Sequence, residues 1–219
     1  MLCKHKILIF QKSPGGNIQT MVKDIILITT AYLLGSLNAA IIYSKMVKHD
    51  DIRNYGSGNA GATNTLRTYG IGVAFMVIVF DVAKGIIAVM LAKRFSGSDL
   101  AVYAGAFAAV IGHNYPIFEG FKGGKGIAVS GGVSLAIDWR LGLIWITIGL
   151  TIAFLTKYVS LGACVSIALT PILAWFMLDS IPATVFFAVN AALCIYGHRS
   201  NIHRLLTGTE RKTYLRKKD

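Results

Sequence analysis

The sequence has little charge and few acidic side chains. Only 15% of its 219 residues are charged, and 10 acids stand against 22 lysines and arginines. A soluble domain usually has about 25% charged residues, so this composition argues against one. The chain is 54% hydrophobic, and its charges gather between long apolar runs. Each membrane span needs about 20 mostly apolar residues, so the pattern is typical of a polytopic membrane protein.

Cysteines and familiar catalytic signatures are also scarce. The three cysteines, Cys3, Cys164 and Cys194, show neither CxxC nor Cys/His spacing, which argues against a disulfide framework or a metal site. The chain has no HxxxxD pattern, no GxSxG elbow and no Walker loop. We therefore expect no cofactor and no metal, and the sequence points to no dedicated general base.

The net charge of +12 would suggest a nucleic-acid partner in a soluble protein. Here most basic residues lie in short segments between apolar runs, so we expect no nucleic-acid binding. Membrane lipids with anionic headgroups and phosphorylated substrates are the partners that fit this distribution.

The apolar runs predict an all-α membrane protein, a bundle of seven transmembrane helices with substrate loops that face the cytoplasm. Lipid leaves an open chain no other spanning structure than the helix. Because lysine- and arginine-rich short loops stay in the cytoplasm, the 127–156 run must cross twice, with its turn at Arg140. The N-terminus is then outside and the C-terminus inside. Lys93 and Arg94 disagree, and so do Lys4, Lys6 and Lys12, which further favours a start at Met21. The expected spans are 25–46, 71–91, 100–115, two within 127–156, 161–178 and 183–196.

The chain is expected to divide into three parts. Residues 1–22 are polar and basic, and we interpret them as an N-terminal extension that is disordered or not native, with Met21 as an alternative start. Residues 23–212 form the membrane domain, and residues 213–219 form a basic C-terminal tail.

The segment GSGNAGATNTLR, residues 56–67, combines glycines with hydrogen-bond donors. Glycine lets backbone N–H groups approach an anion closely, and arginine binds phosphate bidentately. The alternative is a flexible polar loop with helix caps, which the density of donors disfavours. The donors are Ser57, Asn59, Thr63, Asn64 and Arg67.

The segment GHNYPIFEGFKGGKG, residues 112–126, ends in a cationic glycine loop. Such a loop forms a favourable anion site when it opens a helix. The alternative is a basic turn at the membrane surface. We expect His113 to be a structural hydrogen-bonding residue rather than a base.

The segment GHRSNIHRLLTGTERK, residues 197–212, is informative if it is helical. His198 and Asn201 then share a face at i,i+3 spacing, as do Asn201 and Arg204. The alternative is a basic juxtamembrane helix. Glu210 is the lone acid here and is expected to be a structural ion-pair partner.

Two polar features lie outside these segments. Asp81 and Lys84 are three residues apart inside the second span, and intramembrane charges are usually paired or functional, so we expect a structural pair. Ser160 lies at the cytoplasmic edge of a span and, taken alone, is an ordinary small polar residue.

Together the three segments, in this order and spacing, strongly resemble the PlsY family of membrane acyltransferases, from about residue 25 to residue 212. The resemblance implies a seven-helix enzyme of the bacterial inner membrane whose site faces the cytoplasm. It implies transfer of a fatty acyl group from acyl-phosphate to the 1-hydroxyl of glycerol 3-phosphate, which gives lysophosphatidic acid and phosphate. It also implies that an acyl-phosphate-producing enzyme acts as a partner.

The resemblance also implies residue roles. It gives a structural role to Glu210. The residues expected to be catalytic are Ser57, Arg67, His198 and Asn201. Those expected to bind substrate are Gly58, Asn59, Thr63, Asn64, Gly123, Gly124, Lys125, Gly126 and Ser160. The chain departs from the family at Asn38, where proline is frequent, and at Ala128-Val129, where Ala-Thr is frequent.

Two other classes compete with the enzyme. One is a transporter of a small phosphorylated solute, whose polar residues would lie near the bilayer midplane. The polar clusters here are expected in surface loops, which favours the enzyme. The other is a noncatalytic basic membrane anchor, which would not need the hydrogen-bond donors of residues 56–67.

Overall fold

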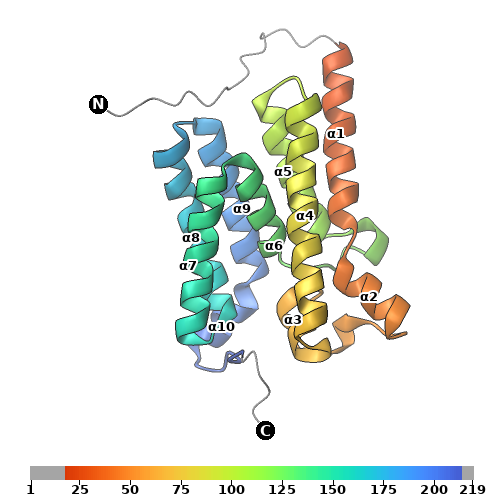
Figure 1. Ribbon diagram of the computed structural model, residues 1–219, viewed down its shortest axis with the longest axis vertical. Coiled ribbons are helices and arrows are strands. Elements are labelled where there is room, and N and C mark those ends of the chain that lie inside the picture. The colour runs from red at the N-terminus through yellow and green to blue at the C-terminus, as the bar shows by residue number, and fades with distance from the viewer. Residues whose placement is uncertain (1–17, 214–219) are drawn as a thin grey trace.

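The computed structural model describes residues 18–213, and all regular structure in this range is helical (Figure 1). The expected tail beyond residue 213, most of the expected extension and Cys3 lie outside the described residues. The helices are α1 (Ile18–Ser36), α2 (Ala39–Val47), η1 (Ile52–Asn54), α3 (Ala62–Tyr69), α4 (Ile71–Phe95), α5 (Asp99–Asn114), η2 (Ile117–Glu119), α6 (Ile127–Ile137), α7 (Trp139–Thr156), α8 (Val159–Leu178), α9 (Ile181–Gly197) and α10 (Arg199–Leu206).

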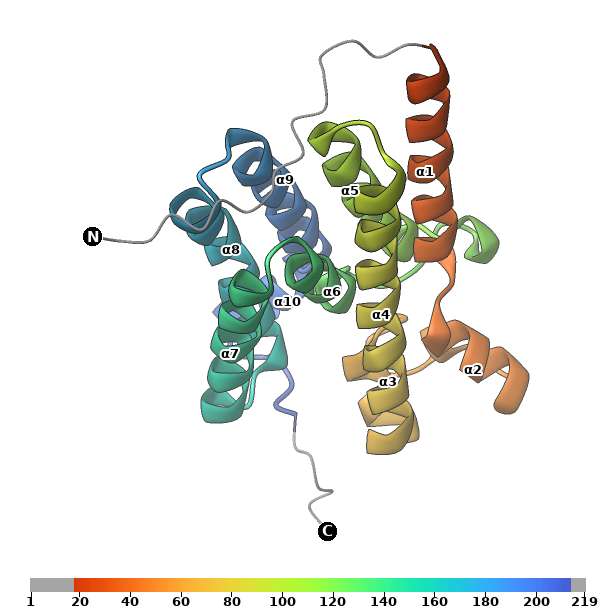
Figure 2. The same cartoon turned by 45° about the horizontal axis from the view of Figure 1, so that its top comes forward.

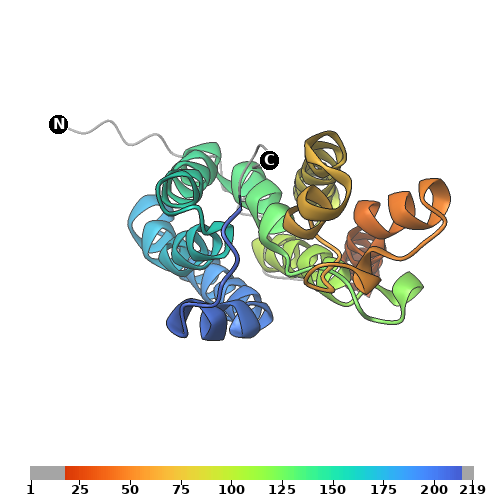
Figure 3. The ribbon, with the colours of Figure 1, turned by 90° about the horizontal axis from the view of Figure 1, so that it is seen from below.

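Two groups of long helices make up the bundle. Helices α1, α4 and α5 pack together on one side, and α8 packs between α7 and α9 on the other. The short helix α6 lies between the groups and packs against both α4 and α7 (Figure 2). Helices α2, α3 and α10 lie at the same end of the bundle, the lower end in Figure 1 and the near end in Figure 3.

Several of these helices can cross a membrane. Among the described residues, four helices are long and apolar enough: α1, α4, α7 and α8. A fifth span results if α9 and α10, which are bent by 63°, count as one. Helix α6 has only 11 residues, short of a full span. The count of seven spans stays a prediction.

The chain turns within residues 127–156 as predicted, but at Asp138, two residues before the expected Arg140. Helix α6 ends at Ile137, and α7 begins at Trp139. The Asp138 side chain caps α7, since its carboxylate accepts hydrogen bonds from the backbone N–H groups of Arg140 and Leu141. An aspartate at this position stabilises a helix start because it pairs with N–H groups that have no partner within the helix.

The first expected span, residues 25–46, is wrong as a single helix. The chain breaks after Ser36, where Asn38 adopts an extended conformation and begins α2. Its side-chain oxygen accepts a hydrogen bond from Ile41 N at 3.1 Å, and its amide nitrogen donates to Ala60 O at 3.0 Å. The asparagine thus stabilises the break and bonds it to the loop of the first glycine-rich segment. An apolar run alone gives no sign of such a cap.

A buried lysine completes this break. Lys84 Nζ donates to the carbonyl oxygens of Gly35 at 3.0 Å and Leu37 at 2.8 Å, groups that an unbroken helix would have paired. The same ammonium lies 2.9 Å from Asp81 Oδ1 and 3.0 Å from His113 Nδ1. The expected Asp81–Lys84 pair is therefore confirmed. His113 makes a buried hydrogen bond, as expected, although His113 and Asp81 also line the cavity described below.

Candidate active site

A cavity of about 370 Å³ opens at the end of the bundle where α3 and α10 lie. Its inner part is an apolar groove bounded by α4, α6, α7 and α8, and the residues of this groove include Ile78, Val82, Ile127, Trp145, Ile146, Leu150 and Ala163. Trp145 is 11 residues before the end of α7, so the groove extends roughly 16 Å from that end.

The outer part of the cavity is polar. We call it the polar mouth, and its residues come from the first glycine-rich segment, from the loop before α6, and from the start of α8 and the α9–α10 corner. They are Ser57, Asn59, Thr63, Asn64, Arg67, Lys125, Gly126, Ser160, His198, Asn201 and Glu210. These residues come from all three sequence segments, so segments far apart in the chain meet at one place.

The first glycine-rich segment is folded around Asn64. Its side-chain oxygen accepts a hydrogen bond from Ser57 N at 2.9 Å, and its amide nitrogen donates to Tyr55 O at 3.0 Å. Gly56 and Gly58 have φ values of 61° and 71°, in the left-handed region that favours glycine. The Asn64 amide therefore bonds to the loop itself, which places Ser57 on the cavity wall.

Arg67 lies on α3 and extends into the mouth. Its Nη2 donates to Arg211 O at 3.2 Å and to Thr213 Oγ1 at 3.0 Å. Within residues 18–213, its Nε and Nη1 have no hydrogen-bond partner in the structure. Burial lowers the pKa of Arg67, but a guanidinium remains protonated at neutral pH. The side chain thus offers a positive charge and open N–H donors to the cavity.

A chain of hydrogen bonds connects the second and third segments. Lys125 Nζ donates to Asn201 Oδ1. Asn201 Nδ2 donates to Glu210 Oε1 at 2.7 Å, and Ser160 Oγ donates to the same oxygen at 2.8 Å. Arg204 Nε donates to the other carboxylate oxygen at 2.7 Å. Glu210 is therefore held by three side chains and orients Asn201 and, through it, Lys125.

The charges of this chain follow from its surroundings. Burial lowers the pKa of Lys125 to about 8, so the ammonium is present at neutral pH and is lost under mildly alkaline conditions. Burial would raise the pKa of Glu210, but hydrogen bonds from Asn201, Arg204 and Ser160 outweigh it and lower that pKa. At neutral pH, an ammonium and a carboxylate therefore face each other across the Asn201 amide.

His198 occupies the corner between α9 and α10. Burial lowers its pKa to about 4, so the imidazole is neutral at pH 7. Its Nδ1 lies 2.8 Å from Cys194 O, and a carbonyl can only accept, so Nδ1 carries the hydrogen. The Nε2 atom is then an acceptor, and it belongs to a side chain that lines the cavity.

Three of the expected phosphate-loop residues lie apart from the cavity lining. Gly58 and Gly123 line a second, open cavity together with Arg53 and Glu119. Gly124 packs directly on His113, where a Cβ would overlap the imidazole ring. Of the glycine loop, Lys125 and Gly126 reach the mouth.

Sequence reasoning missed two groups of residues. The apolar groove residues carry no chemical signature, because an apolar helix face looks the same whether it borders lipid or a cavity. Arg53, in η1, also went unrecognised; it lies just before residues 56–67 and bonds to the backbone of the second segment. The acid two residues before it, Asp51, signals a local pair but not this longer contact.

The fold and the site define an α-helical membrane protein with a cation-lined mouth that continues into an apolar groove. The family model "Glycerol-3-phosphate acyltransferase" matches residues 25–208. A glycerol-3-phosphate acyltransferase of Thermoanaerobacter sp. is 49% identical over 182 residues, which are 83% of this chain and 91% of that protein. One from Alkaliphilus metalliredigens is 42% identical over 190 residues, which are 86% of this chain and 95% of that protein.

Solved structures agree with the sequence relatives. A crystal structure of PlsY (YgiH), an integral membrane glycerol 3-phosphate acyltransferase, in its glycerol 3-phosphate form matches with a TM-score of 0.83 at 36% identity. The match covers 87% of this chain and 96% of that one. The chain belongs to the glycerol-3-phosphate acyltransferase family of integral membrane proteins, which confirms the resemblance of its three segments.

Proposed function

We propose that the protein transfers a fatty acyl group from acyl-phosphate to the 1-hydroxyl of sn-glycerol 3-phosphate, giving lysophosphatidic acid and phosphate. One observation carries the proposal: Arg67 and Lys125 lie at a polar mouth that is continuous with an apolar groove. Such a cavity suits a reaction between a lipid-chain donor and a small anionic acceptor. The related PlsY crystal structures, described as the glycerol 3-phosphate and lysophosphatidic acid forms, support this choice.

The mouth binds phosphate groups and the groove takes the acyl chain. Arg67, Lys125 and Asn201 supply charged and neutral donors, and each charged hydrogen bond contributes about 1.5–3 kcal/mol. Lipid tails are as apolar as the groove wall, so an acyl chain gains little by leaving the bilayer. Affinity therefore comes mainly from the phosphate contacts, and the groove serves to direct the chain.

The reaction needs orientation more than a strong base. The 1-hydroxyl oxygen attacks the acyl carbon, and the bond between that carbon and the phosphate oxygen breaks. The hydroxyl proton passes to the donor's own phosphate group as it leaves. An esterified phosphate has a second pKa of about 6, so this group is a suitable acceptor. His198 Nε2 accepts a hydrogen bond from the 2-hydroxyl, whose hydrogen is not transferred, and so aligns the 1-hydroxyl for the attack. Ser57, Asn59 and Thr63 supply neutral donors around the same mouth.

The proposed function also requires an arrangement of the helices in the membrane. We infer seven membrane helices, α1, α4, α5, α6, α7, α8 and α9, of which α6, with 11 residues, is shorter than a full span. The mouth then lies on the cytoplasmic side of a bacterial inner membrane. The gathering of α2, α3 and α10 with their basic residues at one end supports this orientation (Figure 1). Acyl-phosphate must be supplied by an enzyme that acylates phosphate, and such an enzyme is the expected partner.

The test is a reaction with purified protein, glycerol 3-phosphate and palmitoyl-phosphate, with phosphate release and lysophosphatidic acid measured. Product is expected with palmitoyl-phosphate and not with palmitoyl-CoA. His198→Ala removes an orienting hydrogen bond and is expected to raise the KM for glycerol 3-phosphate and to lower kcat modestly. A steep loss of kcat confined to proton transfer, with substrate binding intact, would make His198 the base. Folded protein that yields no product from either donor, yet moves glycerol 3-phosphate into vesicles, would be a transporter.

A further inference from the structure

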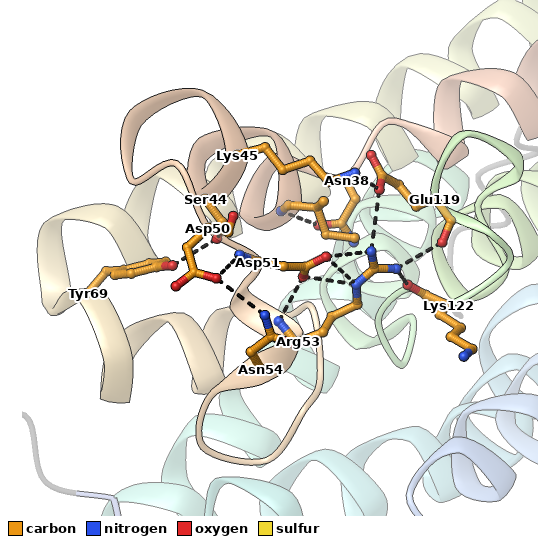
Figure 4. A network of polar contacts seen from close by, with 11 residues as sticks. Asn38, Ser44, Lys45, Asp50, Asp51, Arg53, Asn54, Tyr69, Glu119 and Lys122 are labelled. Atoms are coloured by element: carbon orange, nitrogen blue, oxygen red, sulfur yellow. Dashed lines mark hydrogen bonds and ion pairs between the residues drawn. The ribbon is translucent and has the colours of Figure 1, made fainter.

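A polar network outside the cavity connects η1, which lies just before the first glycine-rich segment, to the second glycine-rich segment (Figure 4). Its centre is Arg53 in η1. The guanidinium Nε donates to both carboxylate oxygens of Asp51 at 2.9 and 3.0 Å, and Nη2 donates to Oδ2 at 2.6 Å. Its Nη1 donates to two backbone carbonyls of the second segment, those of Glu119 at 2.8 Å and Lys122 at 3.0 Å. One side chain thus joins η1 to the second segment.

The two ends of this connection are themselves fixed. Asp51 caps η1, since its Oδ1 also accepts from Arg53 N at 2.9 Å. On the other side, the Glu119 carboxylate pairs with Lys45 of α2 at 2.6 Å and lies 3.7 Å from Arg53 Nη2. The guanidinium is therefore held in one orientation, with its plane directed at the second segment.

The second carbonyl that Arg53 binds lies just before the glycine loop. Gly123 N donates to Asn114 O at 3.1 Å, and Gly124 N donates to His113 O at 3.0 Å. Lys125 follows at once and reaches into the mouth. Since only two residues separate Lys122 from Lys125, a shift of the Lys122 carbonyl would displace the ammonium that faces the substrate.

The neighbouring cavity does not suit a phosphate. It is lined by Asp51 and Glu119 as well as by Arg53 and Lys122. The N–H groups of Arg53 are directed at its own chain, and two carboxylates nearby would repel an anion. The guanidinium is thus suited to hold a loop and not to bind a ligand.

We propose that Arg53 is a positioning residue for acyl transfer: it fixes the second glycine-rich segment against η1 and so places Lys125 at the polar mouth. The inference rests on the proposed function. It extends that function to a residue that touches neither substrate.

The central test compares Arg53→Lys with Lys45→Ala. Lysine keeps the charge, but a single ammonium cannot replace a fork that reaches Asp51 and two carbonyls. The KM for glycerol 3-phosphate is expected to rise about tenfold, with kcat within threefold of wild type. A variant that merely folded less well would lose kcat and keep its KM. Lys45→Ala removes a half-exposed ion pair to the same segment and should leave both constants within twofold.

A second measurement separates this inference from the proposed function. Glycerol 3-phosphate is expected to raise the Tm of the purified wild-type protein and to raise that of Arg53→Lys much less. If glycerol 3-phosphate raises the Tm of the wild type more than that of Arg53→Lys but the wild type shows no turnover, acyl transfer is ruled out. The role of Arg53 in placing Lys125 at the mouth then still stands. If the wild type turns over and Arg53→Lys has the same KM and the same Tm shift, the positioning role is overturned.

Discussion

Four cations of this protein fall into two kinds. Lys84 and Arg53 direct their N–H groups at the chain itself: at helix-end carbonyls and Asp81 in one case, at loop carbonyls and Asp51 in the other. Arg67 and Lys125 line the cavity, and each has N–H groups that are not used in hydrogen bonds to the described residues. All four are wholly or partly buried, so burial does not distinguish them. The partners of each cation separate those that hold the fold from those that can hold a substrate.

The largest expected effect is a loss of stability, and it follows from a substitution at Lys84, a cation of the first kind. Lys84→Met leaves the Asp81 carboxylate buried without its ammonium and removes the donor to Gly35 O and Leu37 O. Loss of one partner of a buried pair costs about 3–5 kcal/mol, or roughly 10 °C in Tm for a chain of this size. Thermal unfolding in detergent measures it.

The matched control is the double variant Asp81→Asn/Lys84→Met, which removes both charges. It is expected to recover a good part of the lost Tm, because no lone carboxylate remains. Equal stability of the single and double variants would show that the helix-end carbonyls matter more than the ion pair.

The next largest effect is a loss of activity, and it follows from a substitution at Arg67, a cation of the second kind. Arg67→Ala is expected to lower kcat/KM about a hundredfold, the equivalent of one strong charged hydrogen bond. Its Tm should fall far less than that of Lys84→Met, because the two bonds from Nη2 are partly exposed. Arg199→Ala is a suitable control, since Arg199 is an exposed cation at the start of α10, at the same end of the bundle. A Tm loss as large as that of Lys84→Met would place Arg67 among the structural cations.

The sequence predicted the second kind of cation better than the first. Arg67 and Lys125 stand in segments where glycines and donors are dense, and the chemistry of phosphate binding follows from such a composition. The role of Arg53 depends on backbone carbonyls 66 and 69 residues away in the chain. The amino-acid sequence does not indicate which backbone carbonyl a folded loop will direct at a distant arginine. These two hydrogen bonds therefore could not be predicted.

The fold shows the same division. A turn near Asp138 could be predicted, although at Arg140, because the positive-inside rule favours two crossings by residues 127–156. The break at Asn38 could not, since it depends on Ala60 O and on Lys84, which meet Asn38 and its neighbours only after folding. The groove behind the mouth depends on the spacing of α4, α6 and α7, which no apolar run specifies.

A smaller effect is expected in the pH dependence of kcat/KM, and it tests whether Lys125 acts on the substrate. Because the pKa of Lys125 is about 8, the ammonium is charged below that pH and neutral above it. The profile of kcat/KM, which reports the free enzyme, is therefore expected to fall tenfold per pH unit on the alkaline side of about pH 8. Lys125→Arg should lower the plateau and remove this fall, since a guanidinium does not deprotonate there. An unchanged alkaline fall in Lys125→Arg would assign it to another group.

The smallest expected effect concerns Ser160, which contacts the mouth through Glu210. Its hydroxyl donates to Glu210 Oε1, and Asn201 Nδ2 donates to the same oxygen. Ser160→Ala therefore leaves that oxygen with one donor, a loss of about 1 kcal/mol or roughly fivefold in kcat/KM. Thr170→Val, which removes another buried hydroxyl from α8, is the control and should leave kcat/KM unchanged. A hundredfold loss in Ser160→Ala would mean that the serine itself contacts the substrate, because a shared second donor to Glu210 is too weakly coupled to Lys125 to account for it.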